Sequence, residues 1–273
     1  MPYITIEGIR VYYEEAGSGP ALVMIHGASQ DTLSWHDTIP PLAKSHTVYA
    51  LDLPGHGKSE LVDRRPTTDS TEFARIVGGF LDAKEIEGAV LIGHSLGAGV
   101  SMLTALERPG RVKGVVAVCG GAAFRGPTGV TYQPDMLANT EINPTEWLET
   151  IFHSVLGRTT SLERQREMAF DATRCSPYVA YADLLAYSSF NLHEKIHLIT
   201  KPVFYIVGED DWSTTPDMAR TTSEELERRG VATEFNELKG IGHIPHWEQP
   251  EAFNEVLFGV LDRLATAPER AAA

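Results

Sequence analysis

Short segments that are almost entirely apolar alternate along this chain with longer segments of helical periodicity. The apolar segments are residues 21–25, 48–51, 89–92, 112–118 and 202–207. The helical patterns cover residues 33–43, 70–81, 95–107, 215–229 and 248–264. A strand without polar alternation is buried on both faces, which is typical of a parallel sheet. The pattern therefore predicts a doubly wound α/β fold with a mostly parallel sheet, preceded by a hairpin over residues 4–15.

The alternation of strands and helices stops between residues 122 and 197. This segment has helical patterns and many aromatic residues, Trp147 among them, but no strong strand. A loop of that length without structure of its own is uncommon in a compact domain. We therefore predict a helical cap over residues 122–197, inserted in a core formed by residues 1–121 and 198–266. The alanine-rich end, residues 267–273, is expected to be a flexible tail.

Composition narrows the class of protein. The 273 residues carry a formal net charge of −14, which argues against the clustered basic surface of nucleic-acid-binding proteins and against attraction to anionic membranes. No apolar run approaches membrane-spanning length, and the first residues lack the pattern of a signal peptide. The two cysteines, Cys119 and Cys175, have no metal-ligand spacing. We expect a cytoplasmic protein without metal or cofactor that acts on a small molecule.

A serine lies where one apolar segment ends and a helix of small residues begins. The sequence there is Gly93-His94-Ser95-Leu96-Gly97, a G-x-S-x-G pattern. In this setting the serine occupies a sharp, strained turn that exposes its hydroxyl at the edge of the sheet. The flanking glycines fit because a Cβ atom would collide with the neighbouring strand and helix. Ser95 is therefore the predicted nucleophile.

A serine hydroxyl is a weak nucleophile at neutral pH and needs a base within hydrogen-bonding reach. Of ten histidines, His243 is favoured because it lies in a loop between the last expected strand, residues 233–238, and the last helix. Loops beyond the carboxyl ends of strands are where α/β proteins place their sites. His246, three residues further on, is the alternative.

The base needs a carboxylate that orients its ring and stabilises the imidazolium. Three acids, Glu209, Asp210 and Asp211, follow the strand over residues 202–207. A turn at Gly208 would bring Asp211 toward the site, and Asp210 is the alternative. The other strand that could supply an acid, residues 112–118, ends without one.

Acyl transfer also requires hydrogen-bond donors for the oxyanion of the transition state. The backbone N–H of Leu96 follows the nucleophile directly. A second N–H is expected from the loop after residues 21–25, which continues His26-Gly27-Ala28. Gly27 permits the bend, so Ala28 is the predicted second donor.

Together these motifs resemble the α/β-hydrolase superfamily over nearly the whole chain except the cap. The residues that carry the resemblance are His26-Gly27, Asp52-Leu53-Pro54-Gly55-His56-Gly57-Lys58-Ser59, Gly93 to Gly97, Gly208 to Asp211, and Gly242-His243 with Glu248-x-Pro250-Glu251. The order Ser95, Asp211, His243 is that of the superfamily. The resemblance implies that the 52–59 turn is architectural and has no catalytic role.

The resemblance also implies a choice of reactions. Dehalogenases and epoxide hydrolases of the superfamily have an aspartate where this chain has Ser95. Esterases, lactonases, cofactor-free perhydrolases and carbon–carbon bond hydrolases all have a serine. Carbon–carbon hydrolases usually have asparagine before the serine and methionine after it, whereas this chain has His94 and Leu96. We therefore expect a serine esterase that cleaves a small to medium, largely apolar ester through an acyl-enzyme.

Four side chains are candidates for the wall of a substrate pocket: Trp35, His94, Trp147 and Trp212. An aromatic-rich cap suits an enclosed apolar cavity.

Three other classes of protein are weaker interpretations. A nucleotide-binding module would need G-x-G-x-x-G spacing, a metal enzyme built on His243-x-x-His246 lacks an identifiable third ligand, and a non-catalytic receptor would usually have lost one of the three catalytic residues.

Overall fold

The computed structural model describes residues 2–123 and 144–270. An eight-stranded sheet has the order β1-β2-β4-β3-β5-β6-β7-β8. The strands are β1 (Tyr3–Ile6), β2 (Ile9–Gly17), β3 (Ala21–Ile25), β4 (Thr47–Leu51), β5 (Ala89–His94), β6 (Val112–Val118), β7 (Val203–Gly208) and β8 (Thr233–Leu238). Strands β3 to β8 run parallel to one another, and β1 and β2 form an antiparallel hairpin at one edge of the sheet. The mostly parallel α/β fold predicted from the sequence is confirmed.

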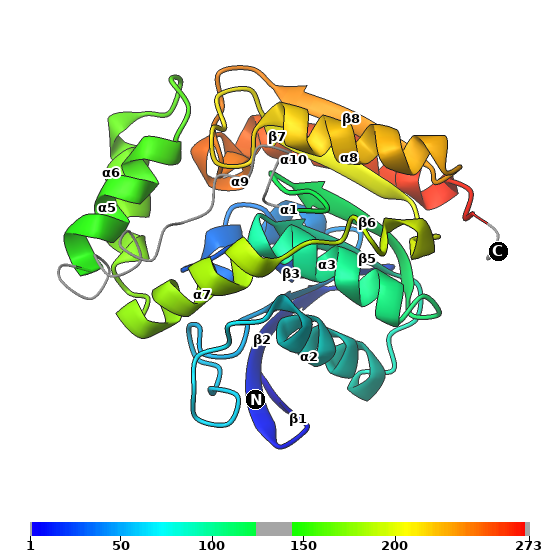
Figure 1. The fold of residues 1–273 in the computed structure, drawn as a ribbon, viewed down its shortest axis with the longest axis horizontal. Coiled ribbons are helices and arrows are strands. Elements are labelled where there is room, and N and C mark those ends of the chain that lie inside the picture. Colours follow the sequence, from blue (N-terminus) through cyan, green and yellow to red (C-terminus); the bar gives the residue numbers. More distant parts are fainter. Residues whose placement is uncertain (1, 124–143, 271–273) are drawn as a thin grey trace.

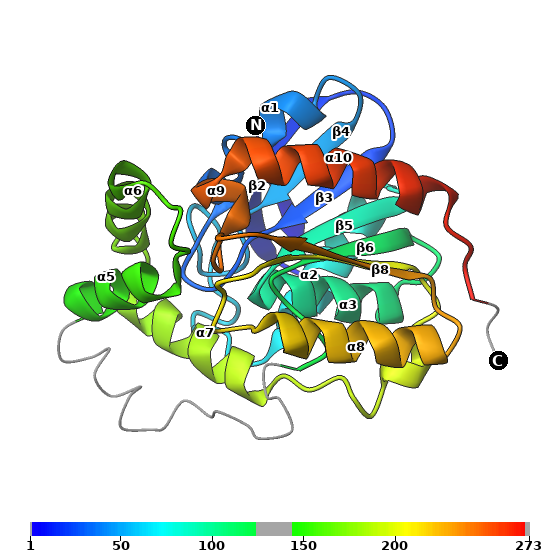
Figure 2. The same ribbon diagram turned by 90° about the horizontal axis from the view of Figure 1, so that it is seen from above.

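Helices cover both faces of the sheet (Figures 1 and 2). On one face lie α2 (Ser70–Ala83), α3 (Leu96–Glu107) and α8 (Pro216–Arg228), and on the other lie η1 (Thr32–Trp35), α1 (Ile39–Leu42), α9 (Pro245–Glu248) and α10 (Pro250–Thr266). Successive residues of one strand therefore enter different cores: Val23 packs with the α2 and α3 side, and Met24 with the α10 side. Burial on both faces is why these strands are continuously apolar.

Two helices differ from the sequence prediction. A single helix was expected over residues 33–43, but η1 and α1 are separate, because Pro40 and Pro41 can occupy only the first turn of a helix. The last helix was expected from residue 248, but α10 begins at Pro250. Gln249, which precedes that proline, has an extended φ of −142° and separates α9 from α10.

In the described part of the chain between β6 and β7, three α-helices gather at one end of the sheet (Figure 2). They are α5 (Pro144–Val155), α6 (Leu162–Ala172) and α7 (Pro177–Ser189), followed by the short η2 (Ile196–Leu198). Leu148, Phe152 and Met168 form a small core with Ile244 and Trp247 of the main domain. The two ends of the insertion meet, since the N–H of Leu192 donates to the carbonyl of Ala122.

Part of the expected tail is held in place. Arg270 donates from its backbone N–H to the carbonyl of Thr200 and from its guanidinium to that of His197, and Glu269 pairs with Lys201.

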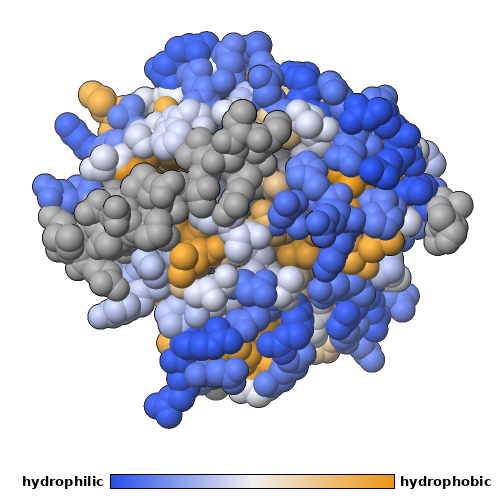
Figure 3. Space-filling view, in the orientation of Figure 1, coloured by the Kyte–Doolittle hydropathy of each residue, from blue (hydrophilic) through white to orange (hydrophobic). Residues whose placement is uncertain are grey.

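Hydrophilic residues cover most of the face in Figure 3, with hydrophobic residues in separate patches. Among the helices of the described residues, none has both the length and the apolar character to cross a membrane.

Candidate active site

Ser95 lies on a tight turn between β5 and α3, and its backbone angles are φ 51° and ψ −115°. Left-handed φ values are uncommon for a residue with a side chain. The turn is possible because of the glycines on either side. A Cβ atom on Gly93 would lie 2.1 Å from the carbonyl oxygen of Gly97, and one on Gly97 would lie 2.3 Å from the carbonyl oxygen of Ile25. The strained turn predicted from the sequence is therefore present.

The structure brings Ser95, His243 and Asp211 together from the loops after β5, β8 and β7. The Oγ of Ser95 lies 2.9 Å from Nε2 of His243, and Nδ1 of the same ring lies 2.7 Å from Oδ2 of Asp211. A carboxylate only accepts hydrogen bonds, so Nδ1 carries the proton and Nε2 is left to accept the serine hydroxyl. The other oxygen of Asp211 accepts the N–H groups of Ser213 and Thr214. All three side chains are buried.

The alternatives left open by the sequence are not part of this chain of hydrogen bonds. Asp210 instead forms an ion pair with Arg158 on the surface. His246 is wholly buried and stacks on Trp35 with ring centroids 4.0 Å apart. Burial, together with His243, lowers the pKa of His246 to about 3. His246 is therefore a neutral core residue and does not contact the serine.

The loop after β3 leaves the backbone N–H of Ala28 available at the cavity beside the serine. The N–H of Gly27 donates to Oε1 of Gln30 at 3.0 Å, and that of Ser29 donates to Oδ2 of Asp183 at 2.7 Å. Between them, Ala28 lines the cavity that opens onto Ser95, and its N–H has no hydrogen-bond acceptor among residues 2–123 and 144–270. Leu96 is the first residue of α3, where a helix leaves its N–H without an intrahelical partner.

Two buried histidines hold the loops around the site: His26 holds the loop after β3, and His94 holds the loop of His243. The ring of His26 donates from Nδ1 to the carbonyl of Gly27 and accepts the N–H of Leu53 at Nε2. Burial and the nearby His56 lower the pKa of His26 to about 3, so this neutral tautomer is maintained. His94 donates from Nε2 to the carbonyl of His243 at 2.7 Å. It therefore fixes the backbone of the residue that contacts Ser95.

A buried carboxylate, Glu248, also holds the loop that carries His243. Glu248 accepts the N–H groups of Gly242 and Ile244, which flank His243 in the chain. It also accepts the N–H of Gly157, in the link between α5 and α6. The carbonyl of Val155, in the last turn of α5, accepts the N–H of His243 itself. The inserted helices are thus hydrogen-bonded to the loop that carries the histidine.

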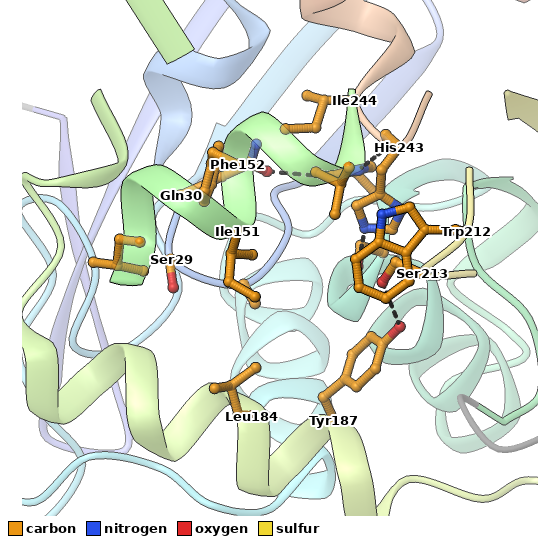
Figure 4. A pocket seen from close by; sticks show the side chains of 15 residues that line it. Ser29, Gln30, Ile151, Phe152, Leu184, Tyr187, Trp212, Ser213, His243 and Ile244 are labelled. Atoms are coloured by element: carbon orange, nitrogen blue, oxygen red, sulfur yellow. Dashed lines mark hydrogen bonds between the residues drawn. The ribbon is translucent and has the colours of Figure 1, made fainter. Parts of the chain in front are cut away.

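A cavity of about 70 Å³ opens onto Ser95 and His243. Its lining is mostly apolar and includes residues of α5 and α7: Leu148, Ile151, Phe152, Val155 and Leu184. Figure 4 shows Ile151 and Phe152 on one side, with Leu184 and Tyr187 on α7 on another. The hydroxyl of Tyr187 lies 3.1 Å from that of Thr214. Helical residues far from the motifs therefore shape the site, and no local pattern distinguished them from the core of the cap.

The four candidate wall residues have different positions. His94 and Trp212 line the cavity, and Trp212 is half exposed and donates from Nε1 to the carbonyl of Ser154. The prediction for Trp35 was wrong: η1 directs its ring into the core on the α10 side, where it is fully buried. The side chain of Trp147, on α5, lies outside the part of the chain that the structure describes.

The described residues contain one group of three potential metal ligands. The sulfur of Cys119, a carboxylate oxygen of Asp211 and a ring nitrogen of His243 lie within 4.8 Å of one another. Burial, with the nearby Asp211, raises the pKa of the Cys119 thiol well above its ordinary value. The sulfur is therefore protonated, and the carboxylate and imidazole are already hydrogen-bonded to each other.

The sequence profile of the alpha/beta hydrolase family matches residues 22–256. The chain therefore belongs to this family of hydrolases, and its fold agrees. A solved thermophilic esterase from Thermogutta terrifontis superposes with a TM-score of 0.86 at 18% identity, over 97% of this chain and all of that one.

Two curated relatives match the sequence over shorter stretches. The dihydrolipoyllysine-residue acetyltransferase component of an acetoin cleaving system from Cupriavidus necator is 41% identical over 117 residues, 42% of this chain and 31% of that protein. The 2-hydroxymuconate semialdehyde hydrolase of a Pseudomonas species is 36% identical over 137 residues, 47% of this chain and 44% of that protein. The chain thus spans less than half the length of these relatives.

Proposed function

We propose that this protein is a serine hydrolase that cleaves carboxylic esters with short, apolar acyl groups through an acyl-enzyme. The observation that carries the proposal is the hydrogen-bonded chain from Asp211 through His243 to Ser95, which ends at an apolar cavity. A nucleophile, its base and the group that orients the base are thus in reach of one another without rearrangement.

In the proposed reaction, the hydroxyl proton of Ser95 moves to Nε2 of His243 as Oγ attacks the ester carbonyl carbon. The N–H groups of Ala28 and Leu96 donate to the oxyanion that forms. When the tetrahedral intermediate collapses, the C–O bond breaks and Nε2 returns the proton to the leaving alkoxide. Asp211 stabilises the imidazolium throughout. Water then repeats the sequence on the acyl-enzyme, which releases the acid and restores the serine.

The size of the cavity limits the acyl group. A cavity needs a volume of about 10–15 Å³ to hold one water molecule, which has a single non-hydrogen atom. By this measure, a cavity of about 70 Å³ holds on the order of five non-hydrogen atoms. The cavity encloses an acetyl or butyryl group, whereas part of a long fatty acyl chain would extend beyond it. The apolar lining favours an uncharged chain, because a charged group would lose its hydration there without gaining a partner.

Carbon–carbon bond hydrolysis is the second candidate. The similarity to the semialdehyde hydrolase favours it, since that match covers 47% of this chain. His94 and Leu96 on either side of the nucleophile argue for the ester reaction instead. Lactonase and perhydrolase activities would use the same serine and are separated from ester hydrolysis only by a substrate panel.

The test is turnover of p-nitrophenyl acetate, butyrate and octanoate by the wild type and by Ser95→Ala. We expect butyrate to be favoured over octanoate, and Ser95→Ala to lose on the order of 10⁴- to 10⁶-fold in kcat. Ser101→Ala is the matched control, because it removes a buried hydroxyl that only donates to the carbonyl of Gly97. Wild-type rates from Ser95→Ala would refute the proposal, and turnover of a vinylogous diketone but of no ester would favour the second candidate.

A further inference from the structure

A carboxylate on an inserted helix reaches the loop that carries the second oxyanion donor. Asp183 lies on α7 and is fully buried. Its Oδ2 accepts the backbone N–H of Ser29 at 2.7 Å and lies 2.9 Å from Nε2 of His56. These partners are 154 and 127 residues away in the sequence. One oxygen thus joins the insertion to two separate loops of the core.

The contact between Asp183 and His56 is an ion pair. Nδ1 of His56 faces the carbonyl of Pro54 at 3.2 Å, and Nε2 faces the carboxylate. Both neighbours can only accept hydrogen bonds, so both ring nitrogens must carry protons. Burial by itself lowers the pKa of His56, but the charge of Asp183 and its hydrogen bond outweigh burial and raise it. The carboxylate therefore has a counter-charge in an otherwise dry position.

Ser29 requires such support because of its backbone. Its φ is 60°, in the left-handed region that residues with a side chain rarely adopt. The N–H that Asp183 accepts belongs to the peptide group that joins Ala28 to Ser29. If this hydrogen bond is lost, Ser29 is free to leave its left-handed conformation, and the chain around it, including Ala28 in the wall of the cavity beside Ser95, is free to shift.

We propose that Asp183 is a positioning residue for the oxyanion loop: by accepting the N–H of Ser29, it holds the loop in the conformation that keeps Ala28 in the wall of the cavity beside Ser95. The inference rests on the proposed function, since it assumes that Ala28 donates to an oxyanion. It assigns to the inserted helix a part in the rate of the reaction as well as in the shape of the pocket. What Ser29 requires is an acceptor oxygen, and the charge of the carboxylate serves the pairing with His56.

A second contact between α7 and the core provides the matched control. The hydroxyl of Ser70, at the start of α2, donates to the carbonyl of Ala186, three residues after Asp183, at 3.2 Å. This contact also fixes the inserted helix but does not touch the oxyanion loop. Ser70→Ala therefore weakens the attachment of α7 and leaves the oxyanion donors in place.

The experiment compares wild type, Ser70→Ala, Asp183→Ala and Asp183→Asn. Each is assayed for kcat and KM with p-nitrophenyl butyrate, for the Ki of a short alkyl trifluoromethyl ketone, and for thermal midpoint. The ketone forms a hemiketal oxyanion on the nucleophile, so its affinity reports the oxyanion donors. Labelling with a fluorophosphonate, lost in Ser95→Ala, shows separately that the nucleophile works. Absence of both labelling and ester turnover in the wild type would reject the proposed function itself.

Asp183→Ala should lose about 10- to 100-fold in kcat, less than the loss of a donor outright, and the ketone Ki should rise by a similar factor with little change in KM. Asp183→Asn keeps an acceptor oxygen but not the charge. It should melt at a lower temperature, yet hold kcat and Ki within about threefold of wild type. Ser70→Ala should affect only the midpoint. A purely structural role predicts instead that activity follows the midpoint in all three variants.

The proposal is overturned if Asp183→Ala keeps the kcat and ketone Ki of Ser70→Ala while Ser95-dependent turnover persists. It is also overturned if folded Asp183→Asn is as impaired as Asp183→Ala. If Asp183→Ala does not fold, Asp183→Glu replaces it, because the extra methylene displaces the oxygen from Ser29. A loss of about tenfold or more in kcat is then expected, and wild-type kcat would reject the assignment.

Discussion

Glu248 offers the sharpest test of how the loop of His243 is held. Its Oε2 accepts the N–H groups of Gly157 and Gly242 at 2.7 and 3.0 Å and the hydroxyl of Thr160 at 2.5 Å, and its Oε1 accepts the N–H of Ile244 at 2.9 Å. The side chain is buried. Four hydrogen bonds thus end on one carboxylate, and they join the link between α5 and α6 to the histidine loop.

Glu248→Gln preserves the shape of this side chain but keeps only one of its two acceptor oxygens. One carboxylate oxygen becomes an NH₂ group, which leaves at least one buried donor, such as the N–H of Ile244, without an acceptor. An unsatisfied buried group costs about 1–3 kcal/mol. The remaining three bonds lose their charge assistance, about 1 kcal/mol each, while the cost of burying a charge disappears. We expect the free energy of unfolding to fall by about 2–4 kcal/mol.

The assay is urea denaturation followed by tryptophan fluorescence, together with kcat for p-nitrophenyl butyrate in the absence of urea. Glu251→Gln is the control, because Glu251 is exposed in the first turn of α10 and should change stability by less than about 0.5 kcal/mol. We expect Glu248→Gln to lower kcat as well, since Gly242 and Ile244 flank the catalytic base. If the two glutamine variants unfold at the same urea concentration, the four hydrogen bonds of Glu248 do not stabilise the fold.

Three further expectations follow from the site. Asp211→Asn should lower kcat by about 10⁴-fold, because the wrong tautomer of His243 is then favoured. The kcat of Asp210→Asn should stay within about threefold of wild type. Equal losses in the two variants would contradict the assignment of Asp211 as the acid that orients His243. Trp35→Phe should lower the urea midpoint and leave KM unchanged, since the ring is in the core; a large change in KM would place it in the pocket after all. The raised pKa of His56 means that its pairing with Asp183 stabilises the fold fully below the unfolded value of about 6.5 and is lost as pH rises through the folded pKa. The stability difference between wild type and Asp183→Asn should therefore shrink from pH 6 to pH 9, and urea titrations across that range test it.

Local sequence determined the elements of the fold and the turn that carries the nucleophile. Continuous apolar runs specify strands buried on both faces, and the two glycines around Ser95 are required because backbone atoms of Gly97 and Ile25 occupy the space of any Cβ. Both features depend on neighbours in the chain or on the sheet that the runs themselves form. The order of motifs was similarly visible without coordinates, and it predicted which loops would meet.

Only the tertiary structure decided which members of each loop take part. Asp210 and Asp211 are adjacent and chemically identical, and they differ only in that one faces Arg158 and solvent while the other faces His243. Trp35 entered the core because of how η1 directs its ring. The pairing of Asp183 with His56 and Ser29 joins residues more than a hundred positions apart, and no periodicity or motif records such a contact. Where a side chain ends, and what it is paired with there, is a property of packing between distant segments.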